Sequence, residues 1–248
     1  MAMGAFQSQQ SQQSGPGATA PFVVLPAQIS DIEPAYDVYF AAFAKEAILD
    51  FLFPGGVDRK AHTEGTKHWW NLDRNGYTIK CVDPDTGKIV GMASWDVFWR
   101  PGEEGAWPKP PGAEWLQGKE REKAETVLVP LWDMHEKLFG KRRHVYLPTM
   151  AVHPDYQRRG IGRLLMQWGI DMAEKLGLPI YLEATDAGFP LYKSMGFERL
   201  THVSVIHKAE VTGSAEDTNV PLMVKMPSKA RGMSFEEWAD KGYPESSE

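Results

Sequence analysis

Two glycines and three arginines gather in the segment Gln157-Arg158-Arg159-Gly160-Ile161-Gly162-Arg163, a combination that suits the binding of a phosphate. The segment precedes a stretch with helical periodicity, and a helix N-terminus leaves about four backbone N–H groups without an intrahelical partner. Aligned peptide dipoles add about half a positive charge there, so an anion is stabilised twice. Because Gly160 and Gly162 have no Cβ, a phosphate can approach the main chain closely. Arginines in a first turn oppose the helix dipole, and a bound anion would explain them.

The elements on either side place this segment between a strand and a helix. Residues 144–152 form a predicted strand, and 162–176 a helix that ends at Gly177. Residues 180–184 form a second strand, and a strand, helix and strand at this spacing imply a right-handed parallel crossover. A solvated basic turn is the alternative interpretation, and these flanking elements argue against it. The helix has one apolar face, made of Ile161, Leu165, Trp168 and Met172.

The rest of the chain alternates between helical and strand patterns. Residues 77–82 and 89–99 form a predicted hairpin around the turn at 83–88. We also predict strands at 22–25, 197–206 and 220–226, helices at 30–43, 58–73, 114–139 with a break near Pro130, 189–195 and 234–240, an irregular insertion at 101–116 and a polar loop at 211–219.

Two stretches resemble known motifs. Met150-Ala151-Val152-His153-Pro154, followed by the phosphate segment, is similar to the acetyl-CoA motif of the GNAT superfamily of N-acetyltransferases. That motif is an apolar strand ending in V-x-P, then Q/R-x-x-G-x-G/A at the start of a helix. Pro190-Leu191-Tyr192-Lys193-Ser194-Met195-Gly196-Phe197 resembles the second family motif, L-Y-x-x-x-G-F. The resemblance is strong over 144–200, plausible over 21–100 and weak over 101–140 and beyond 211.

This resemblance implies an α/β fold of the GNAT type. The family has a mixed, mostly antiparallel twisted sheet, flanked by helices, whose central parallel strand pair splays around acetyl-CoA. We predict a domain over residues 21–226 with an insertion at about 101–140, and a C-terminal tail over 227–248 with a short helix. Residues 1–20 are rich in Gln and Ser, bury too little apolar area to offset their ordering entropy, and are expected to be disordered.

The resemblance also implies acetyl-CoA as the cofactor and CoA as the product. The Val152 N–H would polarise the thioester carbonyl, as an oxyanion-hole donor. Thr185 stands where the family often has Asn, so this chain departs from the family pattern at a position that would contact pantetheine. The implied cofactor-binding residues are Met150, Ala151, Val152, Gln157, Arg158, Arg159, Gly160, Ile161, Gly162, Arg163, Thr185 and Tyr192.

Three side chains are candidates for proton transfer. Tyr192 matches the position of the family's frequent general acid, which would protonate the departing thiolate; the alternative is that its ring only packs. Glu183 has apolar and aromatic neighbours that would raise the pKa of its carboxyl, so it is our first candidate for the general base, and a structural partner is the alternative. Asp96 is the second candidate, and a chain of water molecules is a third possibility.

The implied activity is transfer of an acetyl group to a primary amine, preferably of a small molecule, by direct attack in a ternary complex. Acetylation of a protein N-terminus or lysine is the first alternative, and an inactive acyl-CoA-binding or interaction module is the second. Several aromatic residues could frame the acceptor, although most are expected in the core: Phe51, Phe53, Trp69, Trp70, Trp95, Trp99, Trp107 and Trp115.

Bulk composition argues against other classes. The net charge of −6 gives no sign of a nucleic-acid surface, and no apolar run approaches the roughly 20 residues of a membrane span. Cys81 is the single cysteine and is expected to be a buried structural residue, and we predict no metal site. A dinucleotide fingerprint would need a third glycine after Gly162, and no G-K-[ST] sequence occurs. We expect a cytosolic protein, or a nuclear one, that is a monomer or a homodimer.

Overall fold

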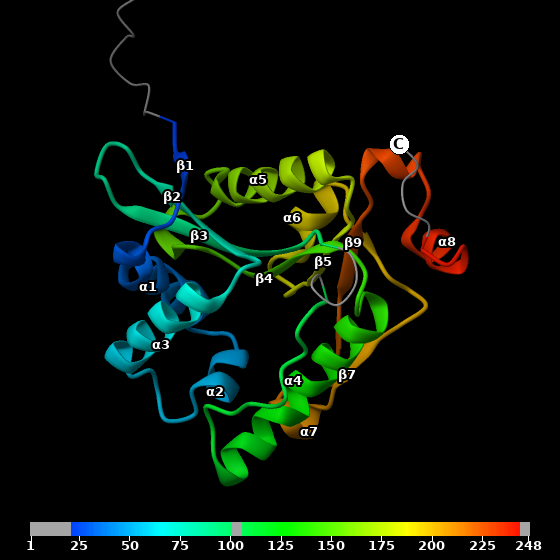
Figure 1. Cartoon of the computed structure of the whole chain (residues 1–248). Helices are drawn as coiled ribbons and strands as arrows, with labels where there is room; N and C mark the ends of the chain where they lie inside the picture. The colour runs from blue at the N-terminus through cyan, green and yellow to red at the C-terminus, as the bar shows by residue number, and fades with distance from the viewer. Residues whose placement is uncertain (1–20, 101–105, 244–248) are drawn as a thin grey trace, which may run out of the picture.

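A computed structural model describes residues 21–100 and 106–243. Within these residues, seven strands form one sheet in the order β1-β2-β3-β4-β5-β9-β6 (Figure 1). β4 and β5 pair in parallel, and the other neighbouring pairs of this sheet are antiparallel, as predicted for a mixed sheet with a central parallel pair. The strands are β1 Val23–Pro26, β2 Gly76–Val82, β3 Ile89–Phe98, β4 His144–Val152, β5 Ile180–Glu183, β6 Glu198–Arg199 and β9 Leu222–Lys225.

Helices cover both faces of this sheet (Figure 1). α5, Ile161–Leu176, lies on one face and buries the predicted Ile161 and Leu165 in its apolar stripe. α1, Ile32–Phe43, lies on the other face and packs against Met92 of β3. The remaining elements are η1 Ile29–Asp31, α2 Ile48–Leu52, α3 Arg59–Leu72, α4 Gly118–Leu138, η3 Pro154–Tyr156, α6 Phe189–Ser194, β7 Val205–His207, α7 Ala209–Thr212, β8 Thr218–Val220, η4 Ser228–Ala230 and α8 Phe235–Asp240.

The two faces of the sheet receive different side chains. Trp95 of β3 is fully buried beneath α5, where a Cβ at Gly169 would overlap its indole ring. Successive residues of a strand point to opposite faces, so Asp96 lies on the face away from α5. Tyr146 of β4 is the register partner of Asp96, and Tyr181 of β5 is the partner of Tyr146. One row of polar side chains therefore crosses three strands on the face opposite α5.

Several predicted elements were wrong, among them the polar loop at 211–219, which overlaps α7 and β8. α4 runs through Pro130 without a break, because apolar packing on both sides of the proline holds the helix together. The predicted strand 197–206 is two strands, since the chain leaves the main sheet after Leu200 and β7 pairs with β8 instead. The predicted strand 220–226 is also divided, because Pro221 separates β8 from β9.

Candidate active site

The parallel strands β4 and β5 separate soon after they meet. Their register pairs are Val145 with Ile180 and Tyr146 with Tyr181. β4 continues to Val152, whereas Leu182 and Glu183 of β5 have no register partner on β4 and pair with β9 alone. The register between β3 and β4 shifts at this point, and an irregularity of this kind bends a strand away from its neighbour. The sheet therefore opens between the C-terminal half of β4 and β5.

The backbone amide of Val152 faces this opening. The N–H of His153 donates to the Val90 carbonyl at 2.9 Å. Hydrogen-bonding directions alternate along an antiparallel ladder, so the N–H and C=O of Val152 point away from β3 and toward the side of β5. The Gln157 side chain donates to the Val152 carbonyl at 3.2 Å, on that same side. The Val152 N–H is thus aimed to the side on which β5 has diverged.

The predicted phosphate segment lies at the start of α5. Gly160 is the N-cap of α5 and has a left-handed backbone with φ of 85°, and Arg158 has φ of 61°. A Cβ at Gly160 would meet nothing within 4 Å, so this part of the turn is open. Main-chain N–H groups around a left-handed turn and at a helix start form a concave site for an anion.

Gly162 also has a packing role that the sequence did not predict. A Cβ at this position would lie 2.9 Å from Leu191 Cδ2, so its small size serves the packing of α5 on α6. Two arginines also have protein partners. The guanidinium of Arg159 lies over the ring of Phe22 at 4.7 Å, and Arg163 donates to Ser194 Oγ at 3.1 Å. A bound anion is therefore unnecessary to explain the positions of these two arginines.

The two predicted bases share the face opposite α5. Burial raises the pKa of Glu183 to about 7, although the Tyr146 hydroxyl opposes the shift by donating to Glu183 Oε2 at 2.9 Å. Burial, together with the nearby charge of Asp73, raises the pKa of Asp96 to about 7 as well. Each carboxyl can therefore exchange a proton near neutral pH, which is what a general base requires.

A pair of buried histidines supports the same face, and sequence reasoning missed it. The Nε2 atoms of His135 and His144 are 2.7 Å apart, and the Arg142 carbonyl accepts from His144 Nδ1 at 2.7 Å. Because the carbonyl can only accept, His144 Nδ1 carries a proton, and neutral His144 accepts at Nε2 from His135. The ring of His135 is 4.3 Å from that of Tyr146. The alternation of His144 and Tyr146 along β4 was the available signal.

Tyr192 lies on α6, among the residues buried on the α5 side of the sheet. Burial raises the pKa of Tyr192 to about 12, so its phenol keeps its proton at neutral pH. A Cβ at Gly188 would lie 2.8 Å from the Tyr192 ring, so the backbone passes close to it. The Thr185 hydroxyl accepts from the Gly188 N–H at 3.1 Å. This hydroxyl therefore has a protein partner at the N-terminus of α6.

Aromatic residues of the first helices and the insertion divide into core and surface. Trp95 and Phe51 are buried, and Trp95 lies on the α5 side of the sheet. Trp69, Trp99 and Trp115 are 62%, 44% and 52% exposed, so they are the surface members of this set.

Other chemistry has little support. Cys81 is buried and burial raises the pKa of its thiol to about 11, so it is poorly suited to form an acyl-enzyme. The described residues contain no group of three or more His, Cys, Asp or Glu side chains placed to hold a metal ion. Among their helices, none combines the length and apolar character needed to cross a bilayer.

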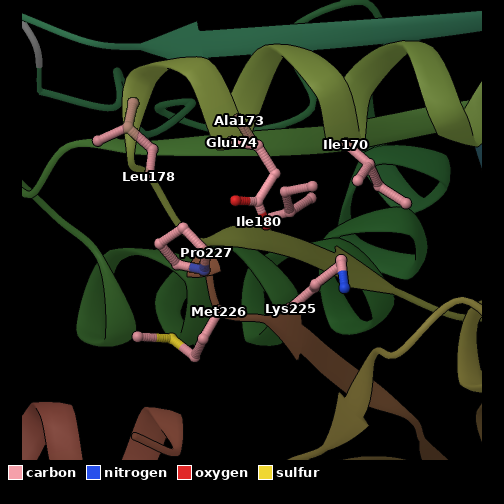
Figure 2. A pocket seen from close by; sticks show the side chains of 8 residues that line it. All are labelled: Ile170, Ala173, Glu174, Leu178, Ile180, Lys225, Met226 and Pro227. Atoms are coloured by element: carbon pink, nitrogen blue, oxygen red, sulfur yellow. The ribbon is translucent and has the colours of Figure 1, made fainter. Parts of the chain in front are cut away.

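Figure 2 shows a pocket at the far end of α5 from Gly160. The Glu174 carboxylate there accepts from the Ser228 N–H at 3.0 Å, so this region joins α5 to the segment that follows β9. It is separate from the opening between β4 and β5. The pocket is lined by Ile170, Ala173, Glu174, Leu178, Ile180, Lys225, Met226 and Pro227.

Comparison with known proteins decides the family. Residues 44–197 match the model of the acetyltransferase (GNAT) family. The chain belongs to the GNAT family of acetyltransferases. A curated relative, "Probable acyltransferase SID5" of Ajellomyces capsulatus, is 46% identical over 145 residues, which cover 58% of this chain and 99% of the relative. The match confirms that this chain is a GNAT acyltransferase, as the two motifs predicted.

Other comparisons cover less of the sequence or reach only the fold. The ribosomal protein bS18-alanine N-acetyltransferase of Escherichia coli strain K12 is 45% identical over 57 residues, 21% of this chain and 38% of that protein. The C-terminal condensation domain of Ebony, solved in complex with beta-alanyl-dopamine, has a TM-score of 0.60 at 14% identity, covering 83% of this chain and 99% of that domain. At this identity the likeness shows the GNAT fold alone.

Proposed function

We propose that this GNAT acetyltransferase transfers an acetyl group from acetyl-CoA to the primary amine of a small molecule, by direct attack in a ternary complex. The observation that carries the proposal is the opening between β4 and β5. It presents the Val152 N–H on the side where a thioester carbonyl could lie. An amide in that position stabilises the negative charge that develops on the carbonyl oxygen during acyl transfer.

The turn around Gly160 would hold the pyrophosphate of acetyl-CoA. Its open, left-handed backbone and the α5 N-terminus supply N–H groups and a favourable dipole. Arg158 would add a positive charge, and Arg163 would add a second one from its position beside α6, where it donates to Ser194. Of the predicted cofactor residues, Gly162 would act indirectly by allowing α5 and α6 to touch.

Glu183 and Tyr192 would divide the proton transfers. With a pKa of about 7, Glu183 accepts a proton from the incoming ammonium or from a bridging water molecule. Tyr192, which stays protonated at neutral pH, donates to the departing thiolate of CoA. They lie on opposite faces of the sheet, so they can act on opposite sides of the thioester. Asp96 remains the second candidate for the base.

A protein N-terminus is the second candidate acceptor. It is favoured by the 57-residue similarity to an enzyme whose printed name gives the alanine of a ribosomal protein as its substrate. That similarity covers 38% of the enzyme, so most of the enzyme's sequence lies outside the match.

The proposal is tested by following acetyl-CoA consumption with two matched panels, one of small primary amines and one of peptides with free N-termini. We expect turnover with members of the first panel, and loss of turnover in Glu183→Gln. Turnover restricted to peptides would support the second acceptor instead. Tight CoA binding without turnover on either panel would contradict an enzyme and favour an acyl-CoA-binding module.

A further inference from the structure

Tyr146 occupies the last parallel pair before β4 and β5 separate. Its ring stacks on that of its register partner Tyr181, with centroids 5.8 Å apart and planes 20° apart. The ring of His135, from α4, lies 4.3 Å away on another side. His135 is itself fixed by its hydrogen bond with His144. The ring of Tyr146 is therefore held by neighbours from two other elements, β5 and α4.

Within the described residues, the one hydrogen bond of the Tyr146 hydroxyl is the bond that it donates to Glu183 Oε2 at 2.9 Å. A phenylalanine would keep the ring contacts and lose this one interaction. Hydrogen bonds that a neutral donor makes to a carboxylate favour the ionised form. Holding a buried carboxylate in one orientation also removes rotamer freedom that a base would otherwise lose during the reaction.

The other polar groups near Glu183 come from three elements. Tyr181 of β5 lowers the pKa of Glu183 less than Tyr146 does, and its hydroxyl lacks the geometry of a hydrogen bond. Burial raises the pKa of the Tyr146 phenol, and the charges of Glu183 and of Asp96 on β3 add to this effect. Burial keeps His135 of α4 neutral by lowering its pKa. Tyr146 therefore remains a donor over the whole working range of pH.

We propose that Tyr146 is a positioning residue, which orients the Glu183 carboxylate toward the acceptor amine and favours its ionised form. This inference rests on the proposed function, because orientation of Glu183 affects turnover only if Glu183 is the base.

The direct test is the titration of Glu183 in protein labelled with ¹³C at the glutamate carboxyls. The Glu183 signal is identified by its absence in Glu183→Gln. In Tyr146→Phe we expect Glu183 to titrate about 1 to 2 pH units higher than in the wild type, since a hydrogen bond to a charged group has that effect. Tyr77→Phe is the matched control, because Tyr77 lies near Trp168 on the α5 side.

A substitution that strengthens the donor should act in the opposite direction. Placing 3-fluorotyrosine at position 146 keeps the ring and makes the phenol more acidic, so Glu183 should titrate at a lower pH. This variant also covers the case in which Tyr146→Phe does not fold. An unchanged Glu183 titration in both variants would overturn the inference, whatever their activity.

Kinetics separates this inference from the proposal beneath it. With acetyl-CoA and the best amine of the panel, the acidic limb of kcat/KM should move upward with the Glu183 titration. At pH 7 this lowers kcat/KM by about 5- to 50-fold, and the rate recovers at higher pH. Full turnover by Glu183→Gln would overturn the assignment of Glu183 as the base. If Glu183→Gln lost the acidic limb of kcat/KM but Tyr146→Phe left that limb unshifted, only the role of Tyr146 would be overturned.

Discussion

Gly162 of α5 and Leu191 of α6 lie so close together that a Cβ at Gly162 would be 2.9 Å from Leu191 Cδ2. Leu191 directly precedes Tyr192, and Gly162 follows the turn proposed to hold the pyrophosphate. The contact therefore links the position of the proposed acid to that of the cofactor site. Because glycine has no side chain, α5 and α6 can approach each other this closely at Gly162.

Replacing Gly162 by alanine should disturb this link. Overpacking costs about 1–3 kcal/mol, partly offset by the roughly 1 kcal/mol by which alanine favours a helix over glycine. We expect a small loss in the free energy of unfolding and a larger fractional loss in kcat, because α6 shifts with Tyr192. In a double-mutant cycle, Leu191→Ala should remove much of the penalty of Gly162→Ala. Strict additivity of the two changes would contradict a direct contact.

Gly160 allows a test of charge at the proposed pyrophosphate site. Its φ of 85° strains any side chain, and a Cβ there meets nothing within 4 Å. Asp and Asn have nearly the same shape and are the residues that best tolerate this conformation. We expect Gly160→Asp to abolish CoA binding, measured by calorimetry, and Gly160→Asn to weaken it only modestly. Equal dissociation constants for the two variants would show that the phosphates lie elsewhere.

Tyr192→Phe should lower kcat by about 100-fold with little change in affinity for acetyl-CoA, if the phenol donates to the thiolate. Because burial raises the pKa of Tyr192 to about 12, the acid stays protonated, and its ionisation should cause no loss of rate between pH 8 and 10. The rate and its pH dependence are measured with saturating amine. A variant as fast as the wild type would remove Tyr192 from the chemistry and leave it a packing role.

Local patterns predicted the elements that form the opening, since β4 was predicted with its observed bounds and α5 within one residue. Each has a regular period or a clear end signal, such as Gly177 at the C-terminus of α5. The two candidate bases also followed from their apolar neighbours along the chain. Features that depend on the partners of a residue in space were the ones that sequence reasoning missed.

Tyr146 shows why those features were missed. Its importance comes from its pairing with Tyr181 and its hydrogen bond to Glu183, which is 37 residues away along the chain. That register depends on an irregularity between β3 and β4, which no local pattern indicates. The packing role of Gly162 was missed for the same reason, because its neighbour Leu191 comes from another helix.

The choice between Glu183 and Asp96 can be decided by the pH dependence of turnover. A base acts when it is deprotonated, so kcat/KM should rise as pH increases through about 7 and level off above it. We expect Glu183→Gln to abolish this rise and reduce the plateau by about 100-fold or more, and Asp96→Asn to retain the rise. The reverse pattern would assign the base to Asp96, whose pKa is also raised to about 7.

The buried histidine pair should make the fold sensitive to acid. Burial lowers the pKa of His144 to about 3, and burial and the neighbouring His144 lower that of His135. The unfolded chain therefore binds protons near pH 6.5 that the folded chain does not bind. Stability from these groups is complete above pH 6.5 and decreases as pH falls below it.

For His144 alone, this linkage amounts to about 2 kcal/mol between pH 6.5 and pH 5. His144→Asn removes the titrating group, so its free energy of unfolding, measured by denaturant titration, should decrease less from pH 7 to pH 5 than that of the wild type, by about that amount. The variant is expected to be less stable than the wild type at pH 7, because it loses the bond to His135. His68→Asn, at an exposed position on α3, should keep the wild-type pH dependence. If His144→Asn showed the same pH dependence as the wild type, the pair would have to accept a proton within the fold, and the tautomers assigned to it would be wrong.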